Sequence, residues 1–172
     1  NDGMVDTEST ALNLLANPSF DSFLAGWSPT NMRGIISEGR LGDTNNKLLR
    51  DHYTATSGTI SQTVDLATLG FGDVVKLDDV LAAGKMSVNF GGWFSTHDHI
   101  DNKVGIKLSF KDENFKAIGS VFEVNSNHTT RISLWSEVNQ TIIVPKGTRS
   151  IVYEVNYSGN NSNVENIFFD SF

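Results

Sequence analysis

The chain has 172 residues, 38% of them hydrophobic, and a formal net charge of −7. This length is enough for one domain with a sizeable core, while the charge argues against nucleic acid and anionic membranes, because no basic stripe could neutralise phosphates. No apolar run approaches the roughly 20 residues that a membrane span requires, and the absence of cysteine excludes disulfides and thiolate metal sites.

The first eleven residues, 1–11, are polar and acidic without periodicity, so we expect a flexible N-terminal segment or linker. The chain begins with Asn-Asp-Gly, which indicates a mature form or a segment of a longer protein. Leu12, Leu14 and Leu15 then predict a short strand, followed by a proline-led turn. The next aromatic residue, Trp27, is expected to fill the core.

The middle of the chain supplies one strand with a clear period of two and one helix. Between Thr59 and Val64 the residues alternate, which predicts a half-buried strand. A two-turn helix is expected over Leu77 to Ala83. Asp78 or Asp79 would lie near its start, where the helix dipole favours a negative charge.

The stretch from Met86 to Val124 predicts three strands of one antiparallel sheet, with one face in the core and one open to water or a ligand. In the first strand, side chains alternate between the faces, so Trp93 and Asn89 share the polar face opposite Phe90. The expected core residues of the first two strands are Met86, Val88, Phe90, Phe94, Val104, Ile106, Leu108 and Phe110. A bulge at Gly91-Gly92 would reverse the face of Trp93.

Further strands are expected around Trp135, over Ile142 to Val144 and over Ile151 to Tyr157. Many short strands separated by turns, without alternating helices, predict an all-β antiparallel sandwich rather than a βαβ fold.

Motifs at both ends of the chain resemble a known family. The opening run is Asn-Leu-Leu-x-Asn-Pro-Ser-Phe-Asp at 13–21, followed by Gly26-Trp27-Ser28. The closing runs are Val144-Pro145-Lys146-Gly147-Thr148-Arg149-Ser150-Ile151 and Asn166-Ile167-Phe168-Phe169-Asp170-Ser171-Phe172. Together they resemble the galactose-binding-like jelly-roll modules, carbohydrate-binding modules appended to secreted glycoside-active enzymes and surface proteins.

A fainter resemblance spans about Ile60 to Tyr157, where the strand and turn pattern is similar to the sugar-binding domain of F-box proteins, also a β-sandwich. Both resemblances imply a jelly-roll sandwich, here covering residues 12–172. The first resemblance also implies an extracellular or cell-surface, non-catalytic carbohydrate-binding module that is fused to other domains. The net charge and the lack of a long apolar run predict that it neither binds nucleic acid nor inserts into a membrane.

An exposed indole beside amides and hydroxyls suits a sugar, because the ring packs on the pyranose while polar groups bond its hydroxyls. Trp93 is the first candidate for this stacking role and Trp135 the second; each could instead pack beneath a loop. The residues predicted to donate or accept hydrogen bonds to a glycan are Asn89, His97, Asp98, His99 and Lys107.

The His97-x-His99 pair is also a candidate metal site, since alternate residues of an extended strand project to the same side. With Gly91 before it, this spacing resembles the first metal motif of the cupins, a family of metal-dependent β-sandwich enzymes. The expected glutamate is absent, however, and Ser150 stands where a later histidine would be. A polar loop that contacts solvent or ligand is therefore favoured over cupin-like chemistry.

The family resemblance implies one further site, a structural calcium ion between the first and last strands. Asp21 and Asp170 match the positions that hold it, and carboxylate oxygens suit Ca²⁺. The family more often has Glu at the first position, and the alternative is two surface carboxylates. No catalytic motif is present. The first alternative function is a structural or adhesion domain that contacts other proteins, and a cupin-like enzyme is the less favoured one.

Overall fold

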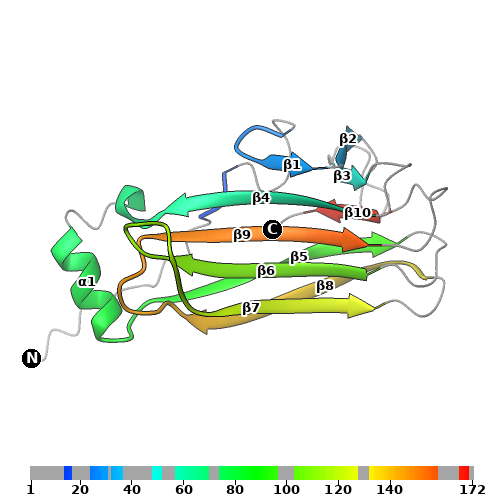
Figure 1. The fold of residues 1–172 in the computed structure, drawn as a ribbon. Coiled ribbons are helices and arrows are strands. Elements are labelled where there is room, and N and C mark those ends of the chain that lie inside the picture. The colour runs from blue at the N-terminus through cyan, green and yellow to red at the C-terminus, as the bar shows by residue number, and fades with distance from the viewer. Residues whose placement is uncertain are drawn as a thin grey trace, which may run out of the picture.

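The computed structural model describes residues 14–16, 24–30, 32–36, 48–51, 57–69, 74–96, 103–127, 132–158 and 167–170. In this part of the chain, two five-stranded antiparallel sheets pack face to face (Figure 1). Strands of one sheet come from distant parts of the sequence, as in a jelly roll. The structure therefore confirms the predicted all-β sandwich.

The strand order of the two sheets follows from their ladders of backbone hydrogen bonds. Sheet A runs β1 (Ser28–Thr30), β4 (Ser57–Asp65), β9 (Ser150–Ser158), β6 (Lys103–Lys111) and β7 (Ala117–Asn127). Sheet B runs β2 (Met32–Ile36), β3 (Leu48–Asp51), β10 (Ile167–Asp170), β5 (Ser87–Thr96) and β8 (Ile132–Ile143). A 3-10 helix at Leu66–Leu69 and the helix α1 (Val74–Ala82) connect β4 to β5.

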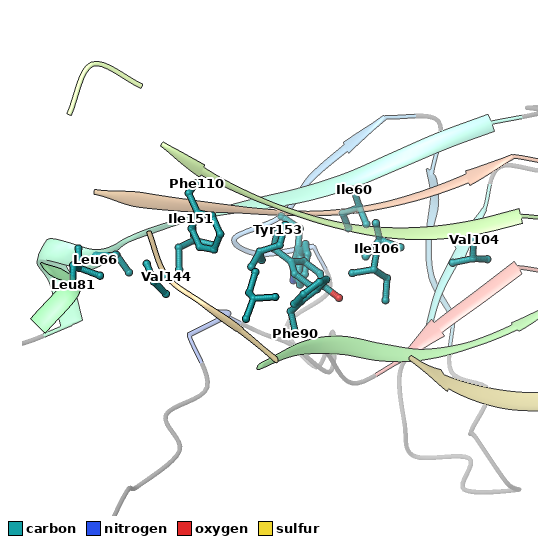
Figure 2. Close-up of a cluster of buried hydrophobic side chains, with 14 of the residues drawn as sticks. Ile60, Leu66, Leu81, Phe90, Val104, Ile106, Phe110, Val144, Ile151 and Tyr153 are labelled. Carbon is teal, nitrogen blue, oxygen red and sulfur yellow. The ribbon is translucent and has the colours of Figure 1, made fainter. Parts of the chain in front are cut away.

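The core lies between the sheets and is made by the alternating side chains that the sequence predicts. Sheet A contributes Ile60, Val64, Val104, Ile106, Leu108, Phe110, Ile151, Tyr153, Val155 and Tyr157, all buried. In Figure 2 side chains of this set point towards Phe90 on β5 of the opposite sheet. Trp27 is 6% exposed and meets the Tyr153 ring edge-on at 6.1 Å between centroids, which confirms its predicted core position.

The prediction that Met86 to Val124 forms three strands of one sheet is wrong. The second and third strands, β6 and β7, pair with each other in sheet A, and β6 also pairs with β9. The first strand, β5, lies in sheet B between β10 and β8. Because local periodicity reports which face of a strand is apolar and not which strand it pairs with, the sequence could not separate these sheets.

The helix α1 is present, but it begins at Val74, so Asp78 lies in its middle and the expected carboxylate at its start is also wrong. The Asp78 carboxylate instead accepts two hydrogen bonds from the Arg149 guanidinium, at 2.8 Å and 3.1 Å. This paired geometry fixes α1 to the turn before β9. No helix in the described residues is long and apolar enough to cross a membrane.

Of the strand predicted from Leu12 to Leu15, the structure describes only the part within residues 14–16, and this part carries no strand pairing. A buried side chain of β4, Gln62, holds this segment instead. Its Oε1 accepts from the Ala16 backbone N–H at 2.6 Å, and its Nε2 donates to the carbonyls of Ala16 and Gly26 at 2.9 Å and 3.1 Å. Since buried amides need partners, these bonds explain a polar residue on the core face of a strand.

One hydrogen bond of the core joins the two sheets directly. The Tyr153 hydroxyl of sheet A donates to the Gly91 carbonyl of sheet B at 2.6 Å. Burial of the phenol disfavours its charged form and raises the pKa of Tyr153 well above its usual value of about 10. The phenol therefore stays protonated in the folded protein at pH values where an unfolded chain would lose the proton.

Stability is consequently expected to fall as the pH rises above about 10. There the unfolded chain releases the Tyr153 proton and the folded chain keeps it, so high pH favours unfolding. Tyr153→Phe should lose about 1 kcal/mol at pH 7 with its hydrogen bond and should decline less steeply between pH 9 and 11. Urea unfolding of both proteins across this range measures the difference, and parallel declines would contradict the assignment.

Candidate ligand-binding faces

The outer face of sheet B carries the first candidate, Trp93. The pairing of β5 with β8 is continuous from Ser87 to Phe94, and the register shifts only after Phe94. The two glycines within this run therefore leave the alternation intact. Because Phe90 is buried in the core, Trp93 lies on the opposite, outer face, as predicted.

The surroundings of Trp93 on this face are polar. Its side chain is half-buried, and its cross-strand neighbours are Glu137 on β8, which is exposed, and Asp170 on β10. Four residues earlier, Asn89 is exposed opposite the exposed Thr141. A sugar ring packed on the indole would lie beside the Glu137 carboxylate, and Asn89 and Thr141, about 13 Å along the strands, would lie beside a further sugar unit.

The outer face of sheet A carries a different predicted residue, Lys107. It lies on β6 between Glu123 of β7 and Glu154 of β9. The Lys107 ammonium is 3.9 Å from a Glu154 carboxylate oxygen, with 39% and 34% of the two side chains exposed. A pair this long and exposed leaves its donors and acceptors open to ligand hydroxyls.

Among the predicted glycan-binding residues whose side chains are described, Lys107 lies apart from the other two. Trp93 and Asn89 lie on sheet B, and Lys107 lies on sheet A with the core between them. Trp135 lies in β8, and only its backbone is described. His97, Asp98 and His99 lie outside the described residues, in the segment that joins Thr96 of β5 to Lys103 of β6. These candidates therefore lie on two separate outer faces of the sandwich.

The predicted calcium ligands are only partly covered by the structure. Asp170 is the last residue of β10 and pairs with Trp93, and Asp21 lies outside the described residues. Within the described ranges, no three His, Asp or Glu residues gather into a group that could hold a metal. The calcium site stays a prediction.

Sequence reasoning missed a second polar feature on sheet A, formed by two amides above a glycine. Gly105 of β6 pairs with Asn125 of β7 on one side and with Asn156 of β9 on the other. A Cβ at Gly105 would lie 2.7 Å from the Oδ1 atoms of both asparagines and 3.0 Å from Asn156 Nδ2. The two amides therefore close over the glycine from both sides. The alternation in the sequence indicates which face of its strand each asparagine lies on. Which residues lie beside it depends on how the strands pair.

The side chains around these amides are polar and of both charges, with Val152 as the apolar exception. The outward residues of β4, β9 and β6 on this face are Ser57, Thr59, Ser61, Thr63, Asp65, Ser150, Val152, Glu154, Asn156, Ser158, Lys103, Gly105, Lys107, Ser109 and Lys111. None of these described residues is aromatic. Mixed charges and many hydroxyl and amide groups suit an uncharged ligand with many hydroxyls better than a strong anion.

Neither a protein-family model nor a curated protein matches the sequence. The fold, in contrast, is shared with solved carbohydrate-binding modules. A structure described as TmCBM61 in complex with β-1,4-galactotriose is 18% identical, with a TM-score of 0.61, over 94% of this chain and 96% of its own. A family 16 carbohydrate-binding module is 16% identical, with a TM-score of 0.57, over 92% and 96%. The chain thus has the β-sandwich fold of carbohydrate-binding modules.

The same fold also occurs as one part of longer chains. The match to the CBM22-1–GH10 modules of Clostridium thermocellum xylanase 10B, complexed with xylohexaose, has 12% identity and a TM-score of 0.54. It covers 89% of this chain but only 26% of the xylanase chain. In that enzyme, a sandwich of this kind is therefore a module beside other parts.

Proposed function

We propose that this chain is a non-catalytic carbohydrate-binding module of a larger secreted or cell-surface protein. The observation that carries the proposal is a sandwich matched almost end to end by modules such as TmCBM61, with a half-buried indole on a polar outer face. On sheet B, Trp93 would pack on a sugar ring and Glu137 would bond its hydroxyls, while Asn89, about 13 Å along β5, would bond a further sugar unit. Trp135 and the 97–99 segment would add contacts.

Affinity is expected to be weak, because a sugar must exchange its bonds to water for bonds of similar strength and a small ligand buries few atoms. A calcium ion held by Asp21 and Asp170 is a further element of the proposal. Such an ion would stabilise the fold and would take no part in chemistry.

The second candidate function is a structural or adhesion domain, favoured by two exposed apolar side chains on neighbouring edge strands. Val121 of β7 is 55% exposed and Ile143 of β8 is 63% exposed. The strands that carry these residues, β7 and β8, are each the edge strand of their sheet. Exposed apolar residues on open edges suit contact with another protein. A cupin-like enzyme, which would use His97 and His99, remains the third alternative.

A glycan panel decides among these functions. We would screen the isolated chain against neutral oligosaccharides that include β-1,4-galactotriose and xylohexaose, once with Ca²⁺ and once with a chelator. Selective binding is expected, and Trp93→Ala should weaken it about tenfold, which corresponds to 1.4 kcal/mol. Thr63→Ala, an exposed change on the opposite sheet, is the matched control.

A folded protein that binds nothing under both conditions would contradict the carbohydrate-binding proposal and move the search to protein partners. If metal analysis finds a bound transition metal that is lost in the His97→Ala variant, this result would support the enzyme alternative instead. Equal melting temperatures with Ca²⁺ and with chelator would argue against a structural calcium ion.

A further inference from the structure

The glycine at position 105 is unusual for its place in the sheet. It lies inside β6, a strand paired on both sides, where glycine normally weakens a strand because it offers no side chain to pack. Here Asn125 and Asn156 occupy the space beside the glycine that a Cβ would need, since the amide oxygen of each would lie 2.7 Å from a Cβ at position 105. Any larger residue would force these amides apart, so glycine is what keeps them together on the outer face.

One of these amides has an unmet hydrogen-bonding need. Asn156 Nδ2 is shielded from solvent, and no residue of the described chain accepts a hydrogen bond from it. A buried donor without a partner costs about 1–3 kcal/mol. The Asn156 side chain as a whole is half-buried, so a turn about its terminal torsion, which is a soft one, would present the NH₂ group to an acceptor on a ligand.

The amides belong to a polar row that crosses the whole sheet. From β7 to β1, the directly paired residues are Asn125, Gly105, Asn156, Thr59 and Thr30. Four steps between neighbouring strands, each about 4.8 Å, make this row about 19 Å long. The row is long enough for an oligosaccharide and lies beside the loose ion pair of Lys107 and Glu154.

We propose that this row on the outer face of sheet A is a second saccharide site, centred on Gly105 and independent of Trp93. It would take a neutral oligosaccharide laid across the strands, recognised through hydrogen bonds to amides and hydroxyls and without aromatic stacking. Asn156 Nδ2 would donate to a ligand oxygen, and Lys107 and Glu154 would bond hydroxyls of the next unit. This inference rests on the proposed carbohydrate-binding function.

The test follows two groups by nuclear magnetic resonance while ¹⁵N-labelled protein is titrated with the members of the glycan panel. The side-chain NH₂ signals of Asn156 report on sheet A, and the indole N–H signal of Trp93 reports on sheet B. We expect at least one neutral oligosaccharide to shift the Asn156 signals, also in the Trp93→Ala variant. Gly105→Ala should weaken this binding at least tenfold, because its methyl group displaces both amides.

Two further variants guard this test against a folding defect. Asn156→Ala removes the unpartnered donor and should weaken the same binding without lowering the melting temperature. Ser109→Ala, on the same strand and face, should bind like the unchanged protein. Glycan binding that Trp93→Ala abolishes, with Asn156 signals that do not move, would overturn the second site and leave the proposed function standing. A folded chain that binds no glycan would overturn both.

Discussion

Gly91→Ala is expected to lower the free energy of unfolding by about 3 kcal/mol or more, because the new methyl group would meet backbone. A Cβ at Gly91 would collide with the Val138 carbonyl oxygen and would lie 2.9 Å from the Val138 carbonyl carbon and the Asn139 Cα. These atoms belong to β8 and cannot move away without breaking its pairing with β5. Urea unfolding followed by circular dichroism would measure the loss.

Gly105→Ala is the matched control for this prediction, since it also adds one methyl group to a strand inside a sheet. Its Cβ would meet only the ends of asparagine side chains, which can turn aside. Its cost should stay below about 1 kcal/mol. Equal losses in the free energy of unfolding for the two variants would show that β5 and β8 can move apart at Gly91 more easily than the structure indicates.

Phe110→Ala is expected to cost about 3–5 kcal/mol, the range for removing a buried aromatic ring from a packed core. The Phe110 side chain is fully buried and meets the Phe122 ring edge-on, with centroids 6.1 Å apart and an interplanar angle of 76°. Removal leaves a cavity between the sheets that the surrounding side chains fill only in part. Thermal or chemical unfolding with an unchanged m-value would confirm a loss of native-state packing.

The control for this change is Phe115→Ala in the hairpin between β6 and β7. Phe115 is 59% exposed and has a backbone φ of 62°. Alanine bears the same left-handed strain as phenylalanine. The change removes exposed surface and the contact of the Lys111 ammonium, which lies 5.8 Å from the centre of the Phe115 ring, so the effect should stay within about 1 kcal/mol. Similar losses at positions 110 and 115 would contradict the division between core and hairpin.

Strand periodicity made much of the fold predictable. The alternation that assigns Ile106 to the core and Lys107 to the surface is a local property, and the structure reproduces it. The burial of Trp27 and the strand after the turn at 145–148 were also predicted. The sequence predicts helix α1, but the helix begins three residues earlier than predicted, at Val74. The prediction overlooks Asp73, which directly precedes Val74 in the sequence and is a residue type favoured just before a helix.

The candidate sites were less predictable because they depend on which strands become neighbours. Trp93 and Lys107 lie only 14 positions apart in the sequence, yet β5 and β6 belong to different sheets. Asn125 and Asn156 lie far apart in the sequence, yet both border Gly105. Which strands pair depends on the packing of the whole domain, and the residue pattern of a single strand does not identify its neighbours.

The position of β10 has a consequence for how the protein is made. Within sheet B, β2 and β3 reach β5 and β8 only through β10, the last of the described strands in chain order. During synthesis, the two halves of this sheet must therefore wait, with unpaired edges, until residues 167–170 leave the ribosome. Closing such long loops is slow, so a nascent chain that stalls before residue 167 should be prone to aggregation and dependent on chaperones.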